Sequence, residues 1–214
     1  WGPPFIENES PYFMSVNRGK KSIALNLNAA KGLDILFKLI KKCDILVENF
    51  KPDRKIKYGI TYQKIKKLNP KIIHLSITGF GNDLSTTQNI PALDLTMQAL
   101  TGIMSVTGPK DRDEPVRIGV AWLDVLTGLT GCSGILSALI QLSRFGKGQY
   151  IDLSLFDVAL MSSINIGETF LLTDNVPKRL GSEHPQIVPY QAFKSSDYWF
   201  ALAVVTEKQY KRLV

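Results

Sequence analysis

The chain has 214 residues, a hydrophobic content of 44% and a formal net charge of +7. This length suits one large domain, or one domain with part of another, and the apolar content is sufficient for a packed core. No run of about 18 apolar residues occurs, so the sequence predicts no transmembrane helix. Cys43 and Cys132 stand far apart in apolar periodic segments, which favours buried free thiols over a disulfide framework.

The positive charge has three possible explanations, and the sequence leaves all of them open. A solvated surface accounts for part of it in any protein. Nucleic acid is a second explanation, but no recognised nucleic-acid motif accompanies the lysines. An anionic small ligand, such as a phosphate-bearing cofactor, is the third. The sequence contains neither a GxGxxG nor a P-loop pattern, so nicotinamide cofactors and Walker-type nucleotide hydrolysis have no motif support.

Residues 1–21 are rich in proline and then polar, and they are predicted to form a loop. Hydrophobic periodicity then predicts strands at 22–27, 44–47 and 71–77, with helices at 28–42 and 62–68 between them. Short connections between such elements are typical of a parallel sheet covered by helices. Ligands of open parallel sheets bind beyond the carboxyl ends of the strands. This rule places Glu48–Phe50 and Thr78–Gly81 beside a candidate site.

The second half of the chain predicts a change of domain. A polar, mobile loop is expected at 82–90. The pattern then predicts a helix at 93–104, a strand at 149–155, a helix at 156–172, and a β-hairpin with strands at 192–193 and 198–205. Proline, glycine and charge between 174 and 189 indicate a boundary. We therefore predict an α/β protein with a large parallel-sheet domain over 1–158, a connecting helix over 159–175 and the start of a smaller domain over 176–214. The chain lacks an initiator Met and stops inside an apparent helix, so we expect a fragment of a longer protein.

Asp124 stands where an apolar approach, residues 116–122, gives way to a long apolar helical run over 126–140. Aspartate is favoured as an N-cap, and a helix N-terminus stabilises an anion, so a purely structural cap is the simpler interpretation. The alternative is an ionised carboxylate, walled by Trp122 and glycines, that attacks an activated acyl group and forms a covalent intermediate. Spacing alone leaves both interpretations open and favours the cap.

Other polar residues also have a structural and a functional interpretation. Asp94 begins a predicted helix and is expected to be its N-cap. His74 lies within a predicted strand, where a core or sheet-face role is favoured over a catalytic base, and His184 lies in a turn. Neither histidine nor cysteine has metal-ligand spacing, so no metal site is predicted. A solvated face and a phosphate clamp remain alternatives for four cations after a strand end: Lys51, Arg54, Lys55 and Lys57.

Six motifs occur in order along the chain, and their combination is far more specific than any single glycine turn. They are Asn17–Ile23, Val47–Pro52, Ser76–Gly81, Thr107–Pro109, Pro115–Ala121 with Asp124, and Gly146–Gln149. Together they resemble the class III CoA-transferases, the family of formyl-CoA:oxalate and carnitine CoA-transferases. The segments Trp1–Phe5, Thr107–Pro109 and Ile187–Phe193 look closest to its succinyl-CoA:glutarate branch.

The resemblance implies a Rossmann-like large domain, a smaller domain and an intertwined homodimer, with the family's first strand and helix missing from this chain. It also implies transfer of CoA from an acyl-CoA to a small free carboxylic acid. Succinyl-CoA is one candidate donor, and a dicarboxylate such as glutarate is one candidate acceptor. Acyl-CoA would be a substrate, and no permanently bound cofactor, nucleic acid or membrane span is expected. The implied setting is intracellular, mitochondrial in a eukaryote and cytoplasmic in a bacterium.

Asp124 falls on the family's catalytic aspartate, which attacks the thioester, forms a mixed anhydride and then becomes an aspartyl-CoA thioester. The family's CoA contacts correspond to Leu25, Asn28, Asn49, Phe50 and Lys57. Its substrate-pocket positions correspond to Trp1, Leu93, Gly181 and His184. Lys57 stands where the oxalate enzyme has arginine, so it keeps the charge but not the bidentate fork.

Two alternatives to CoA transfer remain. The same family contains α-methylacyl-CoA racemases, which use a histidine base directly before the aspartate at position 94. This chain has Leu93 there, which disfavours a racemase or isomerase. A non-catalytic CoA-binding module is the third hypothesis, and tight CoA binding without turnover would support it.

Overall fold

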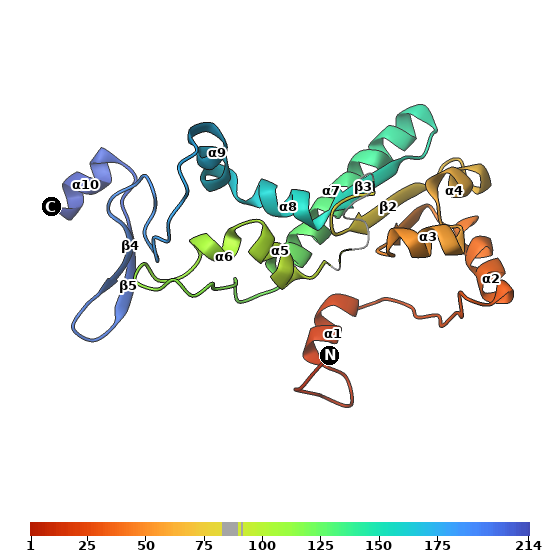
Figure 1. Ribbon diagram of the computed structural model, residues 1–214, viewed down its shortest axis with the longest axis horizontal. Coiled ribbons are helices and arrows are strands. Elements are labelled where there is room, and N and C mark those ends of the chain that lie inside the picture. The colour runs from red at the N-terminus through yellow and green to blue at the C-terminus, as the bar shows by residue number, and fades with distance from the viewer. Residues whose placement is uncertain (83–89, 91) are drawn as a thin grey trace. The chain divides into compact units, whose positions relative to one another are not determined.

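The computed structural model describes residues 1–82, 90 and 92–214. The chain forms two compact units, Trp1–Lys41 and Lys42–Val214, and each is described by itself. Figure 1 shows the order of the elements along the chain. The loop predicted over 82–90 lies outside the described residues except at its two ends. The predicted division into domains at 158 and 175 stays a prediction.

The first unit contains the helices α1 (Pro11–Asn17) and α2 (Ala30–Ile40). Helix α1 lies within the stretch that was predicted as a loop, and the Ser10 hydroxyl caps it by accepting the Phe13 N–H at 3.1 Å. The predicted helix over 28–42 is confirmed by α2. The predicted strand over 22–27 is wrong, because in this unit those residues have no regular secondary structure. Their alternation is not matched by a pairing strand, and a lone strand is not stable.

The second unit is built on a parallel sheet of three strands, β1 (Ile45–Glu48), β2 (Ile73–Thr78) and β3 (Tyr150–Ser154), in the order β1-β2-β3. Strand β2 is central, and its first four residues are buried, as expected for a parallel strand covered on both faces. Glu48 pairs with Ser76, and Ser76 pairs with Asp152. The carboxyl ends of the strands therefore meet at one edge, and the predicted α/β class is confirmed.

Helices connect these strands. Helix α3 (Pro52–Tyr58), which the sequence analysis missed, starts with proline and ends at Gly59 in the left-handed conformation (φ 68°). Helix α4 (Tyr62–Leu68) is confirmed over its predicted range. The helix predicted over 93–104 is two helices, α5 (Asp94–Leu100) and α6 (Ile103–Val106), because Gly102 takes φ 79° between them. Such a positive φ breaks the helical hydrogen-bond ladder.

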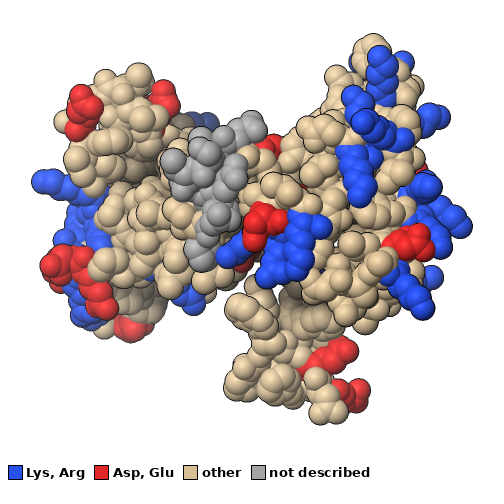
Figure 2. Space-filling model, turned by 45° about the vertical axis from the view of Figure 1, so that its right-hand side comes forward, with Lys and Arg blue, Asp and Glu red and all other residues tan. Residues whose placement is uncertain are grey.

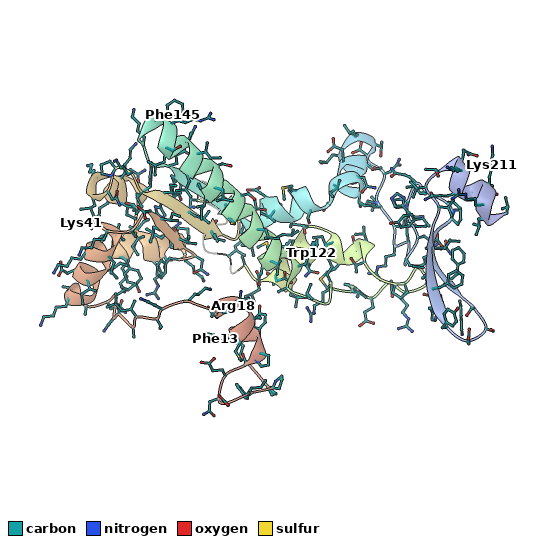
Figure 3. The ribbon with its side chains drawn as sticks, turned by 180° about the vertical axis from the view of Figure 1, so that it is seen from behind. Phe13, Arg18, Lys41, Trp122, Phe145 and Lys211 are labelled. Carbon is teal, nitrogen blue, oxygen red and sulfur yellow. The ribbon has the colours of Figure 1, made fainter. Side chains whose placement is uncertain are left out.

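Helix α7 (Trp122–Phe145) lies along β2 and β3, and Figure 3 labels its first and last residues. A β-carbon at Gly131 would lie 2.9 Å from Leu75 Cδ2, so glycine lets the helix approach the sheet closely. The helix ends at Gly146, which takes the left-handed cap conformation (φ 67°). Cys132, on this helix, is exposed, so the prediction of a buried thiol is wrong there.

The C-terminal part contains α8 (Leu155–Ser162), α9 (Ile164–Thr173), the strands β4 (Tyr190–Lys194) and β5 (Trp199–Ala203), and α10 (Glu207–Leu213). The single helix predicted over 156–172 is bent by 87° between α8 and α9. Ile164 takes φ 39° at the break, a conformation that no continuous helix allows. Strands β4 and β5 form the predicted antiparallel hairpin.

Apolar helices and the distribution of positive charge both bear on what the surface of the protein contacts. Within the described part of the chain, α7 has the length and apolar composition of a membrane-crossing helix, as does the bent pair α8–α9 taken together. This is weak evidence for a membrane span, because a helix that packs on the sheet of a soluble protein passes the same test. Figure 2 shows Lys and Arg side chains at many separate places on the visible surface, which fits solvation as part of the explanation for the net charge.

Candidate active site

Asp124 lies in the first turn of α7 and is its third residue. The N-cap is Ala121, which makes no side-chain capping hydrogen bond. The interpretation of Asp124 as the cap is therefore wrong. The helix begins earlier than the hydrophobic pattern indicated, because the chain already turns at Val120, whose carbonyl accepts the Trp122 N–H at 2.8 Å.

The start of α7 is capped from outside, by Asp94 of α5. Its Oδ1 atom accepts the backbone N–H of Leu123 at 2.8 Å, and its Oδ2 atom accepts Nε2 of Gln98 at 2.6 Å. Gln98 is fully buried and accepts the Ile118 N–H through Oε1 at 2.8 Å. Asp94 was predicted to cap its own helix, but Leu93 holds that position. A carboxylate of one helix thus satisfies an orphan N–H group of another.

Asp124 has an unusual electrostatic environment. Its side chain is open to solvent on one side, yet partial burial and then the nearby Asp94 carboxylate raise its pKa. Among the residues that the structure describes, no donor forms a hydrogen bond to its carboxylate. A carboxylate with a raised pKa and unoccupied lone pairs is more basic, and therefore more nucleophilic, than an ordinary surface aspartate.

A crevice of about 330 Å³ lies in front of this carboxylate, at the carboxyl ends of the strands. Three segments contribute most of its lining: the residues after β1, the end of β2 with the glycine that follows it, and the first turns of α7. The residues that these segments contribute are Asn49, Phe50, Lys51, Pro52, Ile77, Thr78, Gly79, Asp124, Thr127 and Gly128, and Leu155, Ile90 and Ala92 complete the lining. The structure therefore brings Asp124 together with Asn49 and Phe50, which the sequence analysis singled out separately.

Four other predicted site residues of the second unit do not line this crevice. Lys57 lies in the last turn of α3, with Nζ 5.7 Å from the centre of the Tyr58 ring. Leu93 is 60% exposed at the start of α5. Gly181 and His184 lie in the segment before β4. The remaining three predicted residues, Trp1, Leu25 and Asn28, belong to the first unit.

The segment that carries Gly181 and His184 is held by Arg179. Its guanidinium donates to the backbone carbonyls of Met104, Ser105, Arg112 and Asp113 at 2.7 to 3.2 Å. An ion pair between Lys110 and Glu183 adds a second tie. Composition predicted a domain boundary in this segment and the family resemblance predicted pocket residues, but nothing local indicates that its arginine reaches back about 70 residues.

A buried polar network, which no local sequence pattern indicates, lies behind the crevice wall. Lys55, interpreted as part of a solvated face or a phosphate clamp, is 7% exposed. Its Nζ atom donates to Ser76 Oγ at 2.8 Å and lies 3.5 Å from Glu48 Oε1. Both interpretations are therefore wrong for Lys55. His74 is 1% exposed, which confirms its interpretation as a core histidine.

The family model for CoA-transferase family III matches residues 1–214, and the chain belongs to this family. It is 38% identical to the succinate–glutarate CoA-transferase of Agrobacterium fabrum, covering 100% of this chain and 54% of that protein. It is 40% identical to human succinyl-CoA:glutarate CoA-transferase, covering 98% of this chain and 48% of that protein. A CaiB/BaiF family protein from Brucella suis has a similar structure, with a TM-score of 0.87 at 40% identity over 100% of this chain and 57% of that one. The chain spans about half the length of these relatives.

Proposed function

We propose that the protein to which this chain belongs transfers CoA from an acyl-CoA to a free carboxylic acid, with Asp124 as the nucleophile. The observation that carries the proposal is that Asp124 shares one crevice with Asn49 and Phe50 at the carboxyl ends of the strands. Family membership supports the reaction class. The names of the relatives support succinyl-CoA as donor and glutarate as acceptor.

The chemistry requires a carboxylate that can form and release acyl bonds. Asp124 attacks the thioester carbonyl, the C–S bond breaks and the CoA thiolate leaves, which gives a mixed anhydride. The thiolate then attacks the aspartyl carbonyl, releases the donor acid and forms an aspartyl-CoA thioester. The acceptor carboxylate displaces the thiolate from this thioester to form a second anhydride. Attack of the thiolate on the acceptor carbonyl yields the new acyl-CoA and regenerates Asp124.

The position of Asp124 suits these steps. The positive end of the α7 dipole favours the ionised form, while partial burial and Asp94 oppose it. Asp94 fixes the first turn of the helix through its contact with Leu123, and Gln98, which donates to Asp94, fixes the segment before the helix at Ile118. The nucleophile is therefore held on a rigid element, as precise positioning requires.

The remaining features of the proposal rest on family resemblance. Leu25, Asn28 and Lys57 would contact CoA, and Trp1, Leu93, Gly181 and His184 would complete the substrate pocket. The large domain would be Rossmann-like, and two chains would intertwine as a homodimer. No resident cofactor takes part, and the setting would be mitochondrial in a eukaryote and cytoplasmic in a bacterium. A racemase stays disfavoured because Leu93 replaces the histidine base.

The test uses the full-length protein with succinyl-CoA and glutarate, and it follows glutaryl-CoA by chromatography. Asp124→Asn should lower the rate of CoA exchange at least about 10³-fold, because it removes the nucleophile. Asp111→Asn, at an exposed loop position, is the matched control and should keep full activity. Hydroxylamine should trap a modified residue at Asp124 in the wild type. Normal exchange by Asp124→Asn, or trapping at another residue, would refute the proposal.

A further inference from the structure

We infer that Glu48 is a positioning residue for the crevice: its buried carboxylate fixes the Asn49–Phe50 wall and thereby sets the affinity for CoA. Glu48 touches neither the crevice nor Asp124, because it is 6% exposed and is not among the crevice-lining residues. The inference rests on the proposed function in one respect, namely that CoA occupies this crevice.

The first contact that carries the inference joins Glu48 to the crevice wall. Oε2 of Glu48 accepts the backbone N–H of Phe50 at 2.9 Å. This contact closes a tight turn directly after β1 and fixes the peptide between Asn49 and Phe50. The Phe50 ring also packs edge-on against Tyr58 of α3, with ring centroids 5.8 Å apart. The wall is thus held at its backbone by Glu48 and at its side chain by α3.

The second oxygen of Glu48 is held from the opposite side. Oε1 lies 3.5 Å from Lys55 Nζ and 3.4 Å from His74 Nε2, and the three side chains are only 1% to 8% exposed. Lys55 also donates to Ser76 Oγ at 2.8 Å and to Asn82 Oδ1. Oε1 makes no hydrogen bond within the described part of the chain, so Glu48 connects β1, β2 and α3 through the Phe50 hydrogen bond and through its close approach to Lys55 and His74.

The charge on Glu48 follows from these contacts. Burial alone would raise its pKa, but His74, Ser76, Lys55 and the Phe50 N–H together outweigh burial and lower it. The group is therefore ionised at neutral pH and accepts the Phe50 N–H with a full negative charge. Hydrogen bonds of this kind are about twice as strong as those between neutral groups.

A purely structural role and a positioning role predict different results. A buried ion pair is weak evidence for stability, because matched apolar residues often replace it at no cost. Glu48→Leu alone leaves Lys55 buried without its partner and should lower the melting temperature. Glu48→Leu with Lys55→Met removes both charges and should recover most of that loss. Neither variant has an acceptor for the Phe50 N–H, so the wall should stay loose in both.

The experiment measures three quantities on the full-length protein: the Kd for free CoA by calorimetry, the KM and kcat of CoA exchange, and the melting temperature. The double variant should raise Kd and KM about tenfold, which corresponds to about 1.4 kcal/mol. Its kcat should stay within about twofold of the wild type, because Asp124 lies on α7, away from this network. Asp44→Asn, at the other end of β1, is the control and should change none of these values.

Glu48→Gln gives an independent test that does not depend on the leucine variants folding. Glutamine keeps an acceptor oxygen and loses the charge, so the melting temperature should fall while the Kd for CoA stays within about threefold. A tenfold rise of Kd in Glu48→Gln, or a native Kd in a folded double variant, overturns the inference. Failure of the proposed function is distinct, because the wild type would then show no CoA exchange at all.

Discussion

Replacing Gly131 with alanine tests how closely α7, the helix that carries Asp124, must lie on the sheet. A β-carbon at this position would be 2.9 Å from Leu75 Cδ2 and 3.4 Å from Leu153 Cδ2. Leu75 is 2% exposed in the central strand, so its side chain has little free space to move into. The added methyl group should therefore push α7 away from β2.

The expected magnitude is a balance of two effects. Glycine to alanine in a helix interior gains about 1 kcal/mol of stability from helix propensity. Overpacking a buried contact costs about 1–3 kcal/mol, so Gly131→Ala should be neutral to about 2 kcal/mol less stable than the wild type. Gly134 is the matched control on the same helix, because its nearest neighbours, atoms of Ile151, are 3.5 and 3.6 Å away. Gly134→Ala should therefore gain about 1 kcal/mol.

Urea denaturation of the full-length protein measures this difference, and CoA exchange measures its effect on the site. Gly131→Ala should be about 1–3 kcal/mol less stable than Gly134→Ala. Its kcat should also fall, because a displacement of about 1 Å of a reacting group costs up to about a hundredfold in rate. If Gly131→Ala matches Gly134→Ala in both stability and kcat, close packing of α7 on β2 does not set the position of Asp124.

Three further variants change polar or charged side chains at the crevice or beside it. Asp94→Asn keeps an acceptor for Leu123 but removes the negative charge beside Asp124, so the acid limb of the pH profile of kcat/KM should move to lower pH; an unmoved limb contradicts this coupling. Thr127→Val removes a buried hydroxyl that has no partner among the described residues, so urea denaturation should show a gain of about 1 kcal/mol, whereas a loss would reveal a partner. Asp124→Asn should melt at a higher temperature than the wild type once the pH has risen through the raised pKa of Asp124, because the folded state disfavours the ionised carboxylate that the variant lacks. Below the pKa of Asp124 in the unfolded chain, the two proteins should melt at the same temperature, and a difference there would contradict the prediction.

The parallel sheet and its ligand-binding edge were predictable from local patterns. Buried parallel strands are short apolar runs, and the covering helices repeat every three to four residues, so β1, β2, β3, α2 and α4 are placed within two residues of their predicted bounds. The rule that ligands bind at the carboxyl ends of such strands then located the crevice. Each of these inferences needs only sequence neighbours.

The failed predictions depend on partners distant in sequence. The burial of Lys55 depends on Glu48 and on Ser76, which lies 21 residues further along the chain. A charge run around Lys55 carries no sign of these contacts, so solvation is the natural but wrong interpretation. Alternation over 22–27 likewise predicts a strand, although pairing is what makes a strand stable.

The capping of α7 explains why Asp124 could be recognised as important and still be given the wrong structural role. A carboxylate that caps its own helix accepts backbone N–H groups, and those contacts lower its pKa. Here Asp94 accepts the Leu123 N–H, so Asp124, the third residue of α7, lies in the first turn without that bond. The same Asp94 charge then raises the pKa of Asp124. Two carboxylates at one helix end thus have separate roles, one fixing the helix and one facing the crevice, and their different environments set this division.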